Sequence, residues 1–189
     1  MFLKRQDPYL LIVSMTGVKL GDQLLQVGCA HGGRLGAVAA KVGLSGRAVA
    51  VAPDESSAAR ARKGAASAGV LVEVEVAPPT KLPLEAGQFD LAVVDDTGGL
   101  FGTMRAEDRV ASIRELVRVL RPGGRVMIVG AAPRGGLASL LTRAESGPPF
   151  AASGEALTAL EADGFKSVRL LAEREGLVFV EGVKPRRAV

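Results

Sequence analysis

The residues best suited to chemistry lie in two short stretches of the chain. Cys29 and His31 belong to the small-residue segment Gly28–Gly33, where an imidazole two positions from a thiol could serve as its base. Asp95 and Asp96 end an apolar run, and two adjacent carboxylates could act as a general base or hold a divalent cation. Each group also has a structural interpretation. Cys29 could be a small buried residue, His31 a turn residue that covers a pocket mouth, and Asp95 with Asp96 the start of a solvated loop. The residues alone leave these alternatives open.

The segment Leu24–Gly33 has the pattern of a strand, a tight turn and a helix start. An apolar run ends in small residues, and apolar side chains then recur at helical spacing from Leu35 to Val42. Such a junction lets a ligand approach the backbone, with free helix N–H groups aimed at it. We expect Asp95 and Asp96 at the end of the neighbouring strand, at the switch point where α/β sheets bind ligands.

The remaining pattern alternates strands and helices. Predicted strands cover residues 23–28, 48–52, 70–76, 89–94, 125–130, 167–171 and 177–183. Predicted helices cover residues 32–43, 54–69, 106–120 and 153–162, with shorter ones at 8–15, 100–104 and 137–143. The first of these short helices should cover one edge of the domain, and the helix over 106–120 should present Val110, Ile113, Val117 and Leu120 on one face. The last two strands should form an antiparallel hairpin. The order predicts a single α/β domain over 1–189, a Rossmann-like three-layer sandwich with 1–22 as an N-terminal extension.

The composition limits the partners. A net charge of +4 permits contact with nucleic acid, but the basic residues are scattered apart from Lys184, Arg186 and Arg187. With six Phe, one Tyr and no Trp, a base-stacking platform is not expected, so RNA binding is the weakest hypothesis. One cysteine and one histidine exclude a zinc site built from them, and we predict no metal. No apolar run approaches the roughly 18–20 residues of a membrane span. We therefore expect no membrane partner, a cytoplasmic location and a small-molecule substrate.

Three motifs occur in order at a familiar spacing. They are Val27–Gly32 after the first strand, Leu82–Glu85 with Gln88–Asp90 before the fourth, and Arg114–Gly124 before the fifth. Together they resemble the class I S-adenosylmethionine-dependent methyltransferases, and the last is similar to the ubiquinone and menaquinone biosynthetic enzymes. The resemblance implies a seven-stranded sheet of order 3-2-1-4-5-7-6, with strand 7 antiparallel. It also implies S-adenosylmethionine as cofactor and methyl transfer to a small molecule.

The resemblance also implies a set of site residues. The cofactor-binding residues would be Gln26, Gly28, Cys29, Ala30, Gly32, Ala52, Pro53 and Asp95. The catalytic candidates would be Asp95, Asp96 and His31.

The chain departs from the family at three acidic positions, which are occupied here by Gln26, Ala52 and Pro78. The acid that ends strand two accepts hydrogen bonds from both ribose hydroxyls, and Asp54, two residues after Ala52, should point elsewhere. Losing that contact costs about 1.5–3 kcal/mol, or one to two decades in affinity. The alternative function is therefore a degenerate member that binds cofactor weakly or not at all and serves as a binding or scaffold module.

Overall fold

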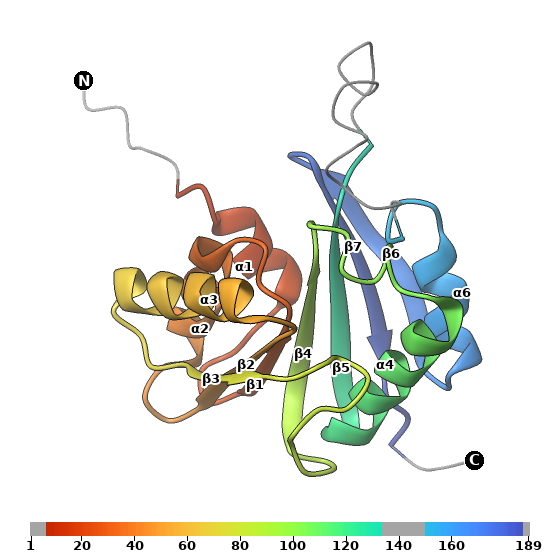
Figure 1. The fold of residues 1–189 in the computed structure, drawn as a ribbon, viewed down its shortest axis with the longest axis horizontal. Helices are drawn as coiled ribbons and strands as arrows, with labels where there is room; N and C mark the ends of the chain where they lie inside the picture. The colour runs from red at the N-terminus through yellow and green to blue at the C-terminus, as the bar shows by residue number, and fades with distance from the viewer. Residues whose placement is uncertain (1–6, 134–149, 187–189) are drawn as a thin grey trace.

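A seven-stranded sheet forms the middle layer of the molecule (Figure 1). The computed structural model describes residues 7–133 and 150–186. The strands are β1 (Gln23–Val27), β2 (Arg47–Ala52), β3 (Glu73–Val76), β4 (Phe89–Asp96), β5 (Leu120–Ala131), β6 (Lys166–Arg174) and β7 (Leu177–Val183). Their order is β3-β2-β1-β4-β5-β7-β6, and β7 runs antiparallel to β5 and β6 while the other neighbours are parallel. The predicted fold, topology and hairpin are confirmed.

Helices cover both faces of the sheet. On one face lie α1 (Leu10–Thr16), α2 (Gly32–Val42) and α3 (Glu55–Ala68), and on the other lie α4 (Ala106–Val119) and α6 (Glu155–Ala162) (Figure 1). The helix predicted near the N-terminus is present as α1. It packs on a face of the sheet, where Ile12 is buried with residues of α2, rather than at an edge. None of the described helices is long and apolar enough to cross a membrane.

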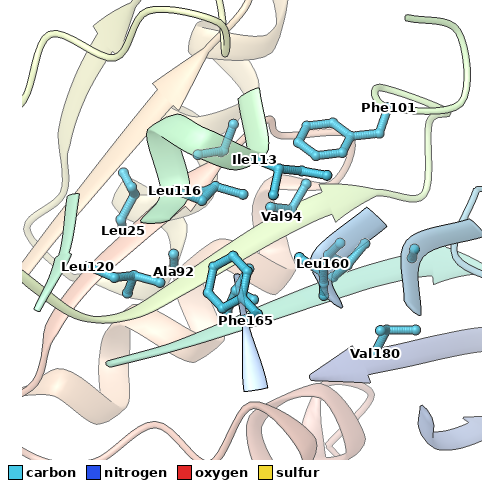
Figure 2. Close-up of a cluster of buried hydrophobic side chains, with 14 of the residues drawn as sticks. Leu25, Ala92, Val94, Phe101, Ile113, Leu116, Leu120, Leu160, Phe165 and Val180 are labelled. Carbon is cyan, nitrogen blue, oxygen red and sulfur yellow. The ribbon is translucent and has the colours of Figure 1, made fainter. Parts of the chain in front are cut away.

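Strand alternation divides the core into two apolar layers. In β4, Ala92 and Val94 face α4 and α6, in the cluster that also holds Phe101 and Phe165 (Figure 2). Leu91 and Val93 face α1 and α2. Because successive side chains alternate, the two aspartates that end β4 leave the sheet on opposite faces, which decides how they can be used.

Three predicted elements differ in the structure. Residues 100–104 form turns rather than a helix, because the N–H of Phe101 donates to the Asp96 carboxylate at 2.6 Å and not along a helix. The predicted inner face of α4 is correct in part: Ile113 and Leu120 are buried and Val117 packs against the core, while Val110 is 36% exposed. The buried face also includes Ser112, Leu116 and Val119. The helical stretch predicted at 137–143 lies outside the described residues.

The fifth strand begins earlier than predicted. β5 starts at Leu120, directly after α4, and includes the segment Arg121–Gly124, which the sequence prediction left as a connection between the helix over 106–120 and the strand over 125–130. The glycines there pair with the chain after β7: the N–H of Gly123 donates to the Lys184 carbonyl at 2.9 Å, and the Lys184 N–H to the Gly124 carbonyl at 2.8 Å. A partner strand therefore extends the ladder through a turn-like sequence.

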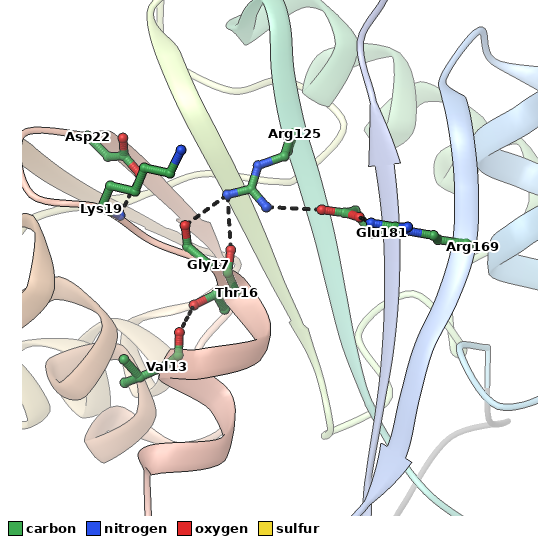
Figure 3. A network of polar contacts seen from close by, with 8 residues as sticks. All are labelled: Val13, Thr16, Gly17, Lys19, Asp22, Arg125, Arg169 and Glu181. Carbon is green, nitrogen blue, oxygen red and sulfur yellow. Dashed lines mark hydrogen bonds and ion pairs between the residues drawn. The ribbon is translucent and has the colours of Figure 1, made fainter.

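A buried carboxylate ties α1 to the sheet (Figure 3). Glu181 on β7 accepts from Arg125 at 3.0 Å and from Arg169 at 2.9 Å, so two guanidinium groups balance its charge. Arg125 also donates to the carbonyls of Thr16 and Gly17 at the end of α1. This network fixes the end of α1 against the sheet.

Candidate functional site

The turn after β1 lies at the point of the sheet where β1 has a parallel strand on each side. β1 pairs with β2 on one side and with β4 on the other, which is the arrangement at which α/β sheets bind ligands. Gly28 opens the turn with φ +77°, and a Cβ at this position would lie 2.7 Å from Leu100 Cδ2. The positive φ favours glycine here, and the Asp95 carbonyl oxygen, 3.2 Å from the same Cβ position, leaves little room for a side chain.

Asp95 holds this turn in place. Its Oδ2 accepts the N–H groups of Ala30 at 2.9 Å and His31 at 3.2 Å, and its Oδ1 accepts both the N–H and the hydroxyl of Thr97. Arg34 on the first turn of α2 lies 3.8 Å from the same carboxylate. A carboxylate offers about four lone-pair positions, so these donors fill its hydrogen-bonding capacity. Asp95 is therefore placed to orient the turn rather than to take a proton from a substrate.

Asp96 points to the opposite face, toward α4. It is buried, its Oδ1 accepts from the N–H of Phe101, and burial raises the pKa of its carboxyl to about 6. The two aspartates therefore do not converge on one cation. Among the described residues, no group of three or more His, Cys, Asp and Glu side chains could hold a metal.

Cys29 and His31 do not form a nucleophile and base. Cys29 is 3% exposed and packs with Leu35, Ala50 and Ala61. Burial raises the pKa of its thiol to about 11, so the reactive thiolate is scarce near neutral pH. His31 is exposed, and its ring meets the ring of Tyr9 edge to face at 5.9 Å.

The other two small residues of the turn have different roles. Ala30 is not among the non-glycine residues of positive φ in the described part of the chain, so its methyl group fits the turn. Gly32 begins α2, and a Cβ there would lie 2.1 Å from the carbonyl oxygen of Arg60 on α3. Gly32 is therefore required for the close approach of two helices.

The three positions where the family carries acids hold no carboxylate. Gln26 is buried, and its amide nitrogen donates to the carbonyl of Gly28 at 3.1 Å. Ala52 is buried at the end of β2, next to the half-buried Pro53, and Pro78 is exposed. Asp54 is the N-cap of α3, and its carboxylate accepts a hydrogen bond from the N–H of Ser57 at 2.8 Å. Its local role is therefore to cap this helix.

Two arginines that the sequence did not single out also contact the turn region. Arg60 Nε donates to the carbonyl of Cys29 at 2.9 Å, and its remaining nitrogens donate to the hydroxyls of Ser56 and Ser57. Arg34 Nη1 donates to the Thr97 hydroxyl at 2.8 Å. The only local signal for Arg34 in the sequence is its position three residues after His31, the N-cap of α2. Its partner Thr97 lies 63 residues away, so no local pattern links the two residues.

Residues 24–124, more than half of the chain, match the family described as "Methyltransferase domain". The chain belongs to the methyltransferase domain family. An uncharacterised protein of Mycobacterium tuberculosis is 34% identical over 132 residues, which is 70% of this chain and 45% of that protein. The ubiquinone/menaquinone biosynthesis C-methyltransferase of Chromobacterium violaceum is 27% identical over 117 residues, 62% of this chain and 46% of that enzyme.

A solved structure shares the fold over almost its whole length. The S-adenosylmethionine-dependent methyltransferase of Aquifex aeolicus superposes with a TM-score of 0.72 at 22% identity, covering 94% of this chain and 93% of that one. The curated relatives are longer, and this methyltransferase-family chain spans less than half of their length.

This fold and family imply S-adenosylmethionine as the cofactor. The turn fits its amino-acid end, because Gly28 has the required backbone conformation and its carbonyl, which accepts one bond from Gln26, has a second lone pair. At the two positions where the resemblance places the ribose and the adenine, the chain has Ala52 and Pro78, which offer no carboxylate. The residues present thus fit the cofactor best at one end.

Proposed function

We propose that this protein transfers a methyl group from S-adenosylmethionine to a small molecule. One observation carries the proposal: a positive-φ glycine turn at the β1–β4 switch point, fixed by Asp95, in a chain of the methyltransferase domain family. The name of the Chromobacterium violaceum relative, a quinone biosynthesis enzyme, supports a small-molecule acceptor.

The chain's own residues would position the acceptor and take its proton. When bound, the cofactor supplies a methyl group on a sulfonium, and its transfer requires mainly alignment of the acceptor. Asp96 is the candidate base, because it ends β4 beside the turn after β1, and burial raises the pKa of its carboxyl to about 6, near the operating range of a general base. His31, exposed beside the turn, is the second candidate. Asp95 would orient the backbone that meets the cofactor.

Calorimetric titration with S-adenosylhomocysteine tests the proposal without knowledge of the acceptor. We expect saturable binding that is about 10 to 100 times weaker than in a site with the ribose carboxylate. Absence of heat at about 1 mM ligand, where even a free energy near −4 kcal/mol would register, would contradict it. That outcome would favour a binding or scaffold role for the fold.

Restoring a carboxylate at the end of β2 should strengthen binding. Ala52 faces the same side of the sheet as Ala50, toward α2 and α3, and is 1% exposed. We expect Ala52→Asp to bind S-adenosylhomocysteine about 10-fold more tightly, through hydrogen bonds from the ribose hydroxyls to the charged group. Ala52→Asn is the matched control, with the same shape and no charge, and should improve binding much less. Equal affinities of the two variants and the parent would contradict a ribose placed at β2.

A further inference from the structure

The charged groups of the candidate site gather at one end of it. Asp95 and Arg34 stand at the turn, on β4 and α2, 3.8 Å apart, while the positions at the ends of β2 and β3 are neutral. Under the proposed function, the turn meets the amino-acid end of the cofactor, which is a zwitterion. An ammonium and a carboxylate there require an acceptor and a donor respectively.

Three backbone donors of the turn are already engaged. The N–H groups of Ala30 and His31 both donate to Asp95, and the N–H of Gly28 donates to the carbonyl of Val51 at 2.8 Å. A ligand carboxylate therefore cannot use these three N–H groups without displacing Asp95 or the Val51 carbonyl. A charged side-chain donor at the same end of the site would bind it more strongly than a neutral N–H, because charge-assisted hydrogen bonds are about twice as strong as neutral ones.

Arg34 has that capacity. A guanidinium carries five N–H donors, and in the described part of the chain the hydrogen bond of Arg34 goes from Nη1 to the hydroxyl of Thr97. Its side chain is 22% exposed, so it is held in place and still reaches solvent. The fork geometry of the remaining donors suits a carboxylate.

We propose that Arg34 binds the carboxylate of the cofactor and that the site selects its ligand by the amino-acid end rather than by the ribose. Asp95 and Thr97 orient the guanidinium for this purpose. The inference rests on the proposed function. It gives Arg34 a part in selecting the ligand, which acidic residues would otherwise have at the positions of Gln26, Ala52 and Pro78.

A pair of ligands isolates this contact. S-adenosylhomocysteine carries the amino-acid group, and 5′-methylthioadenosine keeps the nucleoside and thioether but lacks it. The parent protein should bind the first about 10 to 100 times more tightly than the second. Arg34→Gln should remove most of that ratio by weakening S-adenosylhomocysteine alone, and Arg34→Lys should retain part of it because it keeps the charge.

The control is Arg62→Gln, an exposed arginine on α3 that pairs with Glu55, and it should leave the ratio unchanged. If Arg34→Gln weakens both ligands equally, the arginine only supports the turn and the inference fails while the proposed function stands. A parent protein that binds both ligands equally also overturns it. If the parent binds neither ligand, the proposed function fails first and the assignment of Arg34 falls with it.

Discussion

Replacing Gly64 by alanine should lower the free energy of unfolding by about 3 kcal/mol or more. A Cβ at residue 64 would lie 2.0 Å from the carbonyl oxygen of Gly32 and 2.2 Å from its carbonyl carbon. Both atoms belong to the backbone of α2, so no side-chain rotation relieves the overlap. Separating α3 from α2 would expose the small apolar cluster around Ala61 and Leu35 and would move the residue that begins α2. The variant should therefore lose cofactor binding together with stability.

Urea denaturation followed by circular dichroism measures this loss, and Gly69→Ala is the matched control. Nothing lies within 4 Å of a Cβ at residue 69, so only its φ of +66° opposes the alanine. The control should lose about 1–2 kcal/mol, the cost of a left-handed conformation for an L-residue. Equal losses in the free energy of unfolding for the two variants would mean that α2 and α3 separate at little cost. That result would contradict the claim that their close backbone approach requires glycine at residue 64.

The sheet could be predicted from the sequence because its signals are local. Apolar runs that end in glycine or in Asp95 mark the strands, and the parallel strands buried on both faces read as continuous hydrophobic segments. Errors occurred where a distant partner decides the conformation. Gly123 and Gly124 look like a chain stop until the segment after β7 pairs with them, and Phe101 leaves a helical path because Asp96 accepts its N–H.

The candidate site could be located from the sequence but not assembled. Motif spacing placed Gly28 and Asp95 together. Asp95 and Asp96, whose adjacency in the sequence predicts a pair able to hold a cation, face opposite sides of the sheet. The contacts of Arg34 with Thr97 and of Arg60 with Cys29 join residues 63 and 31 positions apart. A single sequence carries no periodic signal for such pairs, because each depends on how two separate elements are placed in the folded chain.

Protonation of Asp96 should raise the free energy of unfolding as the pH is lowered from about 6 to about 4. Burial raises the pKa of this carboxyl to about 6 in the folded chain, from an ordinary value of 3.8. Between these values the folded state binds more protons than the unfolded state, so the free energy of unfolding falls as pH rises from about 4 to about 6. A difference of about two pKa units corresponds to about 3 kcal/mol. Asp96→Asn, which stays uncharged and keeps an acceptor for the N–H of Phe101, should abolish this dependence.

The change in the free energy of unfolding between pH 4 and pH 8 is compared for Asp96→Asn and the parent. The difference between the two changes measures the contribution of Asp96 titration, because an effect of the substitution that does not depend on pH cancels. Asp108→Asn, at a half-buried position on α4 paired with Arg105, should show the parent's dependence. A similar result for Asp96→Asn would contradict a buried ionisable Asp96. Catalysis places the opposite demand on this carboxyl. A general base must be ionised, so methyl transfer should increase as pH rises through about 6, where the folded protein loses stability. If Asp96 is the base, Asp96→Asn should gain stability at pH 8 and bind S-adenosylhomocysteine normally, yet fail to transfer methyl groups. Retained transfer in that variant would leave His31 as the candidate base.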